Sequence, residues 1–222
     1  MNKLRVLLLV CAAVLLLTAT ARADQVVIDP VGDFLPTLTP AAPRAADLDV
    51  VSAQVSLLGT NFLFSATLNG PINTTPEAFY VWGVDRGAGS TTANFSSLGL
   101  PNIVFDAVVI IQNEGTGVVN DLTGMVGPAP LPQGSITISG NTIEALVPVS
   151  FLASRGFSLD QYGWNLWPRW GGIPFSDAQI SDFAPDDRNA HVTVVPEPAT
   201  LLLLGTGLAI SIARRNRSGK GK

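Results

Sequence analysis

Aspartate pairs at three places in the chain are the side chains best suited to bind a cation. The pairs are Asp29 with Asp33, Asp47 with Asp49, and Asp182 with Asp186. Calcium prefers several oxygen ligands, among them aspartate carboxylates and backbone carbonyls of loops. The spacing is not that of an EF-hand, so a calcium site would be assembled from separate loops. The alternative is that these aspartates are solvated turn formers.

The densest aromatic stretch of the chain is a candidate sugar-binding surface. It contains Trp164, Trp167, Arg169 and Trp170. Exposed tryptophan rings could stack on sugar faces while Arg169 donates hydrogen bonds, whereas buried rings would belong to the core. We expect Trp164 in the core. For Trp167 and Trp170 both alternatives stay open, because Pro168 interrupts strand hydrogen bonding beside them.

No catalytic residue is predicted. His191 is the single histidine, and no Gly-x-Ser-x-Gly elbow accompanies it, so an exposed strand histidine is favoured over a Ser-His-Asp triad. Cys11 is the single cysteine and lies in an N-terminal apolar segment. An aspartate pair could hydrolyse a glycosidic bond, but the separation of the two carboxylates decides that case.

The charge between residues 24 and 195 excludes nucleic acid as a partner. This region has sixteen acidic residues, five arginines and no lysine, which leaves a formal charge near −11. Such a surface offers almost nothing to replace the counterions of phosphates. It suits solubility outside the cell and the binding of cations.

Hydrophobic alternation with a period of two predicts an all-β fold for the middle of the chain. Residues 51–57 and 62–68 form one expected hairpin, and residues 136–139 and 142–147 form another around Gly140-Asn141. Further strands are expected at residues 79–84, 103–111, 162–167 and 191–195. We therefore predict an antiparallel β-sandwich over residues 24–194, jelly-roll-like, with about eight strands.

The N-terminus has the organisation of a secretory signal peptide. Lys3 and Arg5 precede a helical apolar core at residues 6–17, and Ala21 and Ala23 supply an A-x-A cleavage site. We expect a signal peptide at residues 1–23, export by the general secretory route, and a mature chain that begins at Asp24.

The C-terminus combines a proline-rich triplet, an apolar segment and a basic end. The triplet is Pro196-Glu197-Pro198, residues 199–213 carry no charge, and Arg214 and Arg215 follow. As a helix the apolar segment reaches only about 22 Å, against about 30 Å for a bilayer core. It predicts a transmembrane helix that anchors the chain transiently in the inner membrane, with the arginines in the cytoplasm.

This C-terminal pattern, placed at residues 195–222, resembles the PEP-CTERM sorting signal of Gram-negative bacteria. The resemblance implies that an exosortase recognises Pro196, Glu197, Pro198, Arg214 and Arg215 as parts of the signal and processes the tail. The product would then lie at the cell surface or in the extracellular matrix. The alternative is an ordinary C-terminal anchor.

The mature region resembles exported sandwiches of the DOMON and family-nine carbohydrate-binding-module type. The likeness is carried by the stretches at residues 29–33, 47–49 and 182–186. It differs from the redox members, since no methionine and histidine are placed to hold haem. Calcium, expected from the aspartate pairs, is the one candidate cofactor. The expected role is non-catalytic: structural, adhesive or polysaccharide-binding, with exopolysaccharide as partner. A carbohydrate-active hydrolase with an aspartate pair is the alternative.

Overall fold

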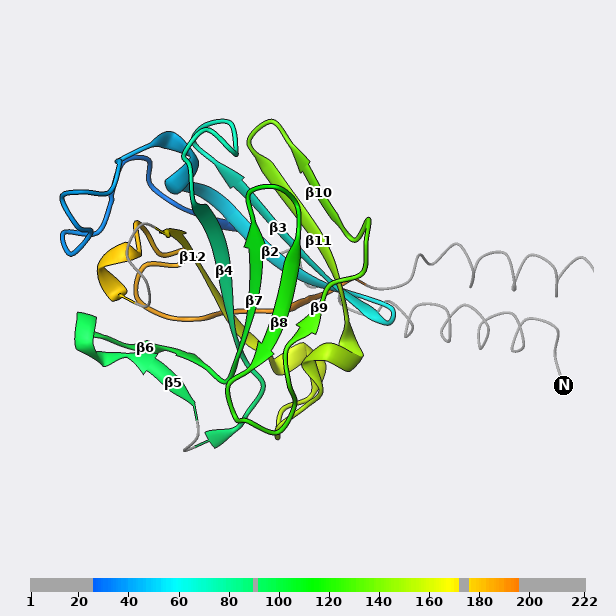
Figure 1. Cartoon of the computed structure of the whole chain (residues 1–222). Helices are drawn as coiled ribbons and strands as arrows, with labels where there is room; N and C mark the ends of the chain where they lie inside the picture. Colours follow the sequence, from blue (N-terminus) through cyan, green and yellow to red (C-terminus); the bar gives the residue numbers. More distant parts are fainter. Residues whose placement is uncertain (1–25, 90–91, 172–175, 196–222) are drawn as a thin grey trace, which may run out of the picture. The chain divides into compact units, whose positions relative to one another are not determined.

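Two largely antiparallel β-sheets form most of the computed structural model, which describes residues 26–89, 92–171 and 176–195 (Figure 1). Each sheet has six strands among these residues, and a separate two-stranded hairpin accompanies them. The all-β prediction is confirmed. The expected number of about eight strands was too low, because several strands are only two or three residues long.

The first sheet has the order β1-β2-β3-β11-β10, and β14 pairs with the far part of β2. Its strands are β1 (Val27–Ile28), β2 (Val50–Leu58), β3 (Asn61–Leu68), β10 (Ile136–Ser139), β11 (Thr142–Pro148) and β14 (Thr193–Val194). Both predicted hairpins are present. Gly59 and Gly140 stand at their turns with φ of 57° and 60°, a left-handed conformation that favours glycine.

The second sheet has the order β13-β12-β4-β7-β8-β9. Its strands are β4 (Ala78–Asp85), β7 (Ala107–Gln112), β8 (Gly117–Asp121), β9 (Ala129–Pro130), β12 (Gly163–Trp170) and β13 (Ala190–His191). Neighbours in sequence pair as hairpins in both sheets, as β2 does with β3 and β7 with β8. Other neighbours lie far apart in sequence, as β3 and β11 do in the first sheet and β4 and β12 in the second. The jelly-roll-like order stays a prediction.

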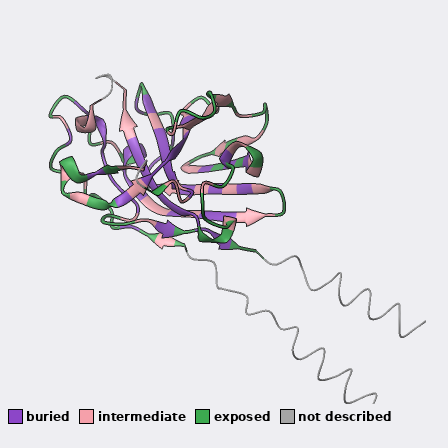
Figure 2. Cartoon of the chain, turned by 90° about the horizontal axis from the view of Figure 1, so that it is seen from below, coloured by how far each residue is buried: buried purple, intermediate pink, exposed green. Residues whose placement is uncertain are grey.

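The main core lies between the two sheets. Phe64 of β3 meets Trp82 of β4 edge-on, with ring centroids 6.0 Å apart, and Phe62 stacks on Tyr162 at 5.6 Å. Trp164 is fully buried in this cluster, as predicted. The buried residues follow the central parts of the strands, and the exposed ones follow the loops (Figure 2). Period-two alternation therefore places one face of each sheet in a shared core.

A second apolar cluster covers the outer face of the second sheet. There the hairpin of β5 (Ala93–Phe95) and β6 (Leu100–Phe105) packs over β4 and β12. Trp167 lies at its centre, with ring centroids 5.0 Å from both Phe95 and Phe105. Gly83 provides the room, since a Cβ there would lie 2.3 Å from the Trp167 ring. This sheet therefore buries aromatic side chains on both faces.

The single strand predicted at residues 103–111 was wrong, because Asp106 divides it. β6 ends at Phe105 and pairs with β5, while β7 begins at Ala107 and pairs with β4. Asp106 is fully buried and accepts hydrogen bonds from the backbone N–H groups of Arg86 and Ala88. The strand is interrupted at Asp106 because its buried carboxylate binds these two N–H groups and the Arg86 guanidinium.

Helical structure in the described part is confined to short 3₁₀ segments: η1 (Ala46–Leu48), η3 (Ser96–Leu98), η4 (Val149–Leu152), η5 (Leu159–Gln161) and η6 (Asp177–Gln179). Within the described ranges no helix has the length and apolar character needed to cross a membrane. The helices predicted for the signal peptide and for the C-terminal tail lie outside these ranges.

Candidate functional site

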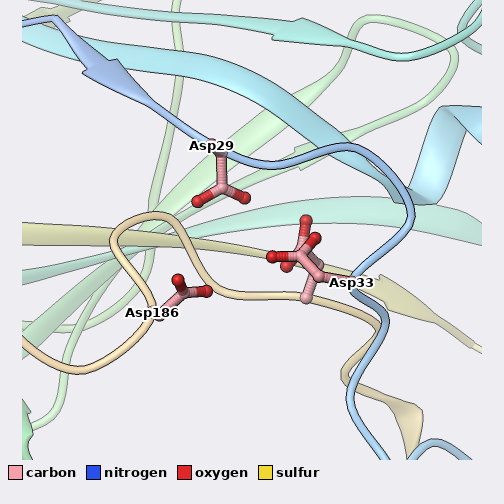
Figure 3. Close-up of side chains that lie close together, drawn as sticks. Asp29, Asp33 and Asp186 are labelled. Carbon is pink, nitrogen blue, oxygen red and sulfur yellow. The ribbon is translucent and has the colours of Figure 1, made fainter.

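Four of the six predicted aspartate ligands meet at one point beside β1. Asp29 follows β1, Asp33 ends the next turn, and Asp182 and Asp186 belong to the segment between η6 and β13. One carboxylate oxygen of each lies within 4.8 Å of one oxygen of every other. Figure 3 shows the carboxylates of Asp29, Asp33 and Asp186 pointing toward one another from these two segments. We call these four residues the aspartate cluster.

Backbone hydrogen bonds hold the two segments of the aspartate cluster in place. The N–H of Asp29 donates to the Val51 carbonyl at 3.0 Å. The Asp182 carboxylate accepts from the Val50 N–H at 2.8 Å and from the Phe183 N–H at 2.8 Å. Asp29 and Asp182 are buried, whereas Asp33 and Asp186 are exposed. The cluster therefore has a rigid buried side and an open side.

Burial and mutual repulsion perturb the titration of this cluster. Burial, followed by the charges of Asp182 and Asp186, raises the pKa of Asp29 to about 9. Burial also raises the pKa of Asp182 to about 7, although the Val50 N–H opposes the shift. The pKa of Asp186 is raised in the same way by burial and by the charge of Asp33. A proton on one of these carboxyl groups neutralises negative charge in the cluster. A bound cation could neutralise the same charge in its place.

Asp47 and Asp49 lie outside the aspartate cluster, and neighbouring loops occupy their carboxylates. Asp47 accepts hydrogen bonds from the Thr74 and Thr75 N–H groups and from the Thr75 hydroxyl. Asp49 accepts from the Gly32 N–H at 3.1 and 3.0 Å, one distance for each carboxylate oxygen. Asp47 and Asp49 are therefore not direct ligands of this cluster, contrary to what we had expected. Instead they stabilise neighbouring loops, and Asp49 holds the turn on which Asp33 lies.

A pocket of about 560 Å³ opens on the outer face of the second sheet, beside the second apolar cluster. Phe79, Val108 and Ile110 form its apolar floor, and Asn94 of the β5–β6 hairpin lies at its edge. Asp177 and Gln179 of η6 contribute polar groups to the lining. Sequence reasoning missed this pocket, because its walls come from six separate stretches of the chain that meet only after folding.

Trp167 and Arg169 line this pocket, but Trp170 is absent from its lining. Trp167 is only 1% exposed, which places its ring in the second apolar cluster rather than on an open platform. Arg169 donates to the Ser176 carbonyl at 2.7 Å and to the Gln179 side-chain oxygen at 3.1 Å. Successive strand residues face opposite sides, so Trp170 cannot share a face with Arg169. Arg169 and Trp170 are both half-buried, so of the three predicted sugar ligands only Arg169 is both partly exposed and part of the pocket lining.

His191 is exposed at the end of β13, as the favoured alternative predicted. Its backbone carbonyl accepts the indole N–H of Trp164 at 3.1 Å. Among the described residues, its imidazole forms no hydrogen bond with a serine or a carboxylate.

A buried ion-pair network near the end of β4 was not anticipated. Arg86 is 1% exposed and contacts the carboxylates of Asp106 and Asp121, while Arg155 pairs with Asp121 from the other side. Burial alone would raise the pKa of Asp121. The hydrogen bonds from Thr123 and Arg155, together with the charge of Arg86, outweigh burial and hold that pKa well below its usual range. The network ties β4, β7, β8 and the loop after η4 together.

The predicted cleavage site at Ala21 and Ala23 lies outside the described residues, as does the sorting signal from Pro196 to Arg215. Comparison with known families supplies the decisive observation for the signal. Residues 194–218 match the PEP-CTERM protein-sorting motif. The match includes the Pro-Glu-Pro triplet, the apolar segment and both arginines, so the predicted sorting signal is confirmed.

The PEP-CTERM motif implies an extracellular protein that exosortase processes, at the surface or outside of a Gram-negative cell. No curated protein and no solved structure matches the chain. The resemblance of residues 24–194 to DOMON and family-nine carbohydrate-binding sandwiches therefore stays a prediction.

Proposed function

We propose that this protein is a non-catalytic module of the bacterial surface or extracellular matrix that binds polysaccharide. In this proposal the signal peptide directs export, the tail anchors the chain briefly in the inner membrane, and exosortase then processes it. The remaining β-sandwich acts as a structural or adhesive component. The PEP-CTERM motif supports the destination, and the pocket beside Arg169 supports the ligand.

The lining of the pocket carries the proposal of a sugar ligand. Phe79 is half-buried, and the Arg169 guanidinium lies 6.0 Å from its ring centroid. An aromatic ring packs against the C–H face of a sugar, while amide and carboxylate groups bind its hydroxyls. Asn94, Asp177 and Gln179 supply such groups around the aromatic floor.

The charge of the module favours a neutral polysaccharide over an acidic one. The region between residues 24 and 195 has a formal charge near −11, which repels polyanions at long range. Asp177 lies close enough to Arg169 to interact with its charge, so the pocket itself is not strongly cationic. Stacking and hydrogen bonds to hydroxyl groups would then provide most of the affinity.

Affinity electrophoresis of the full-length protein in gels that contain neutral or acidic polysaccharide tests this proposal. We expect retardation by a neutral polymer, and about ten-fold weaker binding for Phe79→Ala. Phe157→Ala is the matched control, because Phe157 is an exposed phenylalanine outside the pocket. Asn94→Ala is a second variant with little risk to folding, since Asn94 is exposed. Equal retardation of all four proteins would refute the assignment of the pocket.

A carbohydrate-active hydrolase remains the alternative function, and the arrangement of the acids favours the non-catalytic role. Glycosidases place two carboxyl groups on either side of a bond, about 5–5.5 Å or about 6.5–9.5 Å apart. Asp177 is the one acid among the described residues that line the pocket. Release of reducing ends from a bound polysaccharide, abolished by Asp177→Asn, would establish hydrolysis and overturn the non-catalytic role.

A further inference from the structure

The buried carboxylate of Asp29 points into the aspartate cluster (Figure 3), and one of its oxygens accepts no hydrogen bond from a described residue. Asp29 is 5% exposed, and its Oδ2 atom is buried without a hydrogen bond from any described residue. An unsatisfied buried charge costs several kcal/mol in a protein interior, so such groups are normally paired or bound to metal. The atom therefore requires either a proton or a cation.

The geometry of the aspartate cluster fits a calcium ion. Calcium binds oxygens at about 2.3–2.6 Å, so two ligands on opposite sides of the ion lie about 4.6–5.2 Å apart. The four carboxylate oxygens lie within 4.8 Å of one another, which allows all of them to contact one ion. The flexible coordination of calcium, with six to eight oxygens, leaves positions for water on the open side beside Asp33 and Asp186.

The fold holds the candidate ligands before any ion binds. Asp182 is fixed by two backbone N–H groups of different segments, and Asp49 fixes the turn that leads to Asp33 through the Gly32 N–H. Gly32 has a φ of 85°, a conformation that lets the chain reverse between Asp29 and Asp33. This preorganisation would favour ion binding, because few ligand side chains lose conformational freedom when the ion binds.

We infer that Asp29, Asp33, Asp182 and Asp186 form a calcium-binding site that joins the beginning of the sandwich to its end. The site is separate from the pocket beside Arg169 and does not depend on the binding of polysaccharide. Its position outside the cell membrane would expose it to the calcium of the surroundings rather than to the cytoplasm.

Isothermal titration calorimetry of the full-length protein with calcium chloride, paired with thermal unfolding in calcium and in chelator, tests the inference. We expect saturable binding of one ion and a higher melting temperature in calcium. Magnesium should bind more weakly, because it demands near-octahedral geometry and dehydrates reluctantly. Asp29→Asn should lower the calcium affinity at least about ten-fold. The chelated protein should stay folded, since the amide has the size of the carboxyl group and adds no buried charge.

Asp187→Asn is the matched control, because Asp187 is the exposed neighbour of Asp186 and lies outside the cluster. We expect this variant to keep its affinity to within about three-fold, since an exposed charge contributes little. Asp49→Ala should weaken calcium binding by about 10–100-fold without removing a ligand, as residues that orient metal ligands commonly do. The absence of binding at millimolar calcium, or the same affinity in Asp29→Asn as in the unsubstituted protein, would overturn the site. Tighter binding of magnesium than of calcium would overturn the choice of ion.

Discussion

Arg86→Met is the substitution whose cost the structure predicts most sharply. The guanidinium is 1% exposed and neutralises Asp106, which is fully buried, and it also contacts Asp121 at 3.1 Å and the Ala153 carbonyl at 3.2 Å. Removal of one partner from a buried ion pair costs about 3–5 kcal/mol, because the remaining charge is left uncompensated. For a domain of this size that corresponds to a fall of about 6–20 °C in melting temperature.

Arg188→Met makes the same chemical change at an exposed ion pair. Arg188 and Asp187 are 70% and 66% exposed, so the loss should be about 0–1 kcal/mol. Urea unfolding followed by tryptophan fluorescence would measure both variants, with a chelator present so that calcium does not contribute. If Arg86→Met were within about 1 kcal/mol of Arg188→Met, the reasoning about the buried network would be refuted.

Two further predictions concern acid stability and packing. The pKa of Asp121 is lower in the folded protein than in the unfolded chain, where it is near 4, so the stabilisation that ionised Asp121 provides is lost as the pH falls below about 4. In Asp121→Asn the free energy of unfolding should therefore decline less steeply below about pH 4. An unchanged slope would contradict this. Gly83→Ala should cost about 1–3 kcal/mol, because the new methyl group would overlap the Trp167 ring. Gly127→Ala, where a Cβ meets nothing within 4 Å, should be nearly neutral in the same unfolding assay.

The strands that sequence predicts best are those whose signals are local. The hairpins around Gly59 and Gly140 combine alternating apolar residues with a turn that requires positive φ, and both signals lie within about 18 residues. By contrast, the break at Asp106 depends on Arg86, twenty residues earlier in the chain. A run of apolar residues on either side of a single aspartate does not reveal that partner.

The candidate cation site was predictable as a set of residue types but not as a geometry. Aspartates near turns are natural ligands, and the sequence therefore pointed to six of them. Which four converge depends on the segment at residues 182–186 lying beside the turn at residues 30–33, a contact across about 150 residues. Asp49 belongs to the same region, yet the Gly32 N–H occupies its carboxylate. The residues around Asp49 in the sequence do not reveal that the Gly32 N–H binds its carboxylate.

The aromatic stretch shows a similar limit. Period-two alternation placed Trp164 inside correctly, but the same rule sends Trp167 to the opposite face, which normally meets solvent. Trp167 is buried because the β5–β6 hairpin covers that face. No pattern near Trp167 indicates that hairpin, since β5 has only three residues.

The parallel pairing of β14 with β2 bears on the order in which export, folding and processing occur. Thr193 and Val194 lie beside Ser56 and Leu57, and the matched sorting motif begins at residue 194. A chain that leaves the cell with its N-terminus first releases β2 early and β14 almost last. The first sheet therefore stays incomplete until the residue that opens the sorting motif has emerged. The rest of the motif follows β14 directly, so processing by exosortase and the pairing of β14 with β2 would compete in time. Their order would decide whether a finished sheet or an exposed edge of β2 reaches the cell surface.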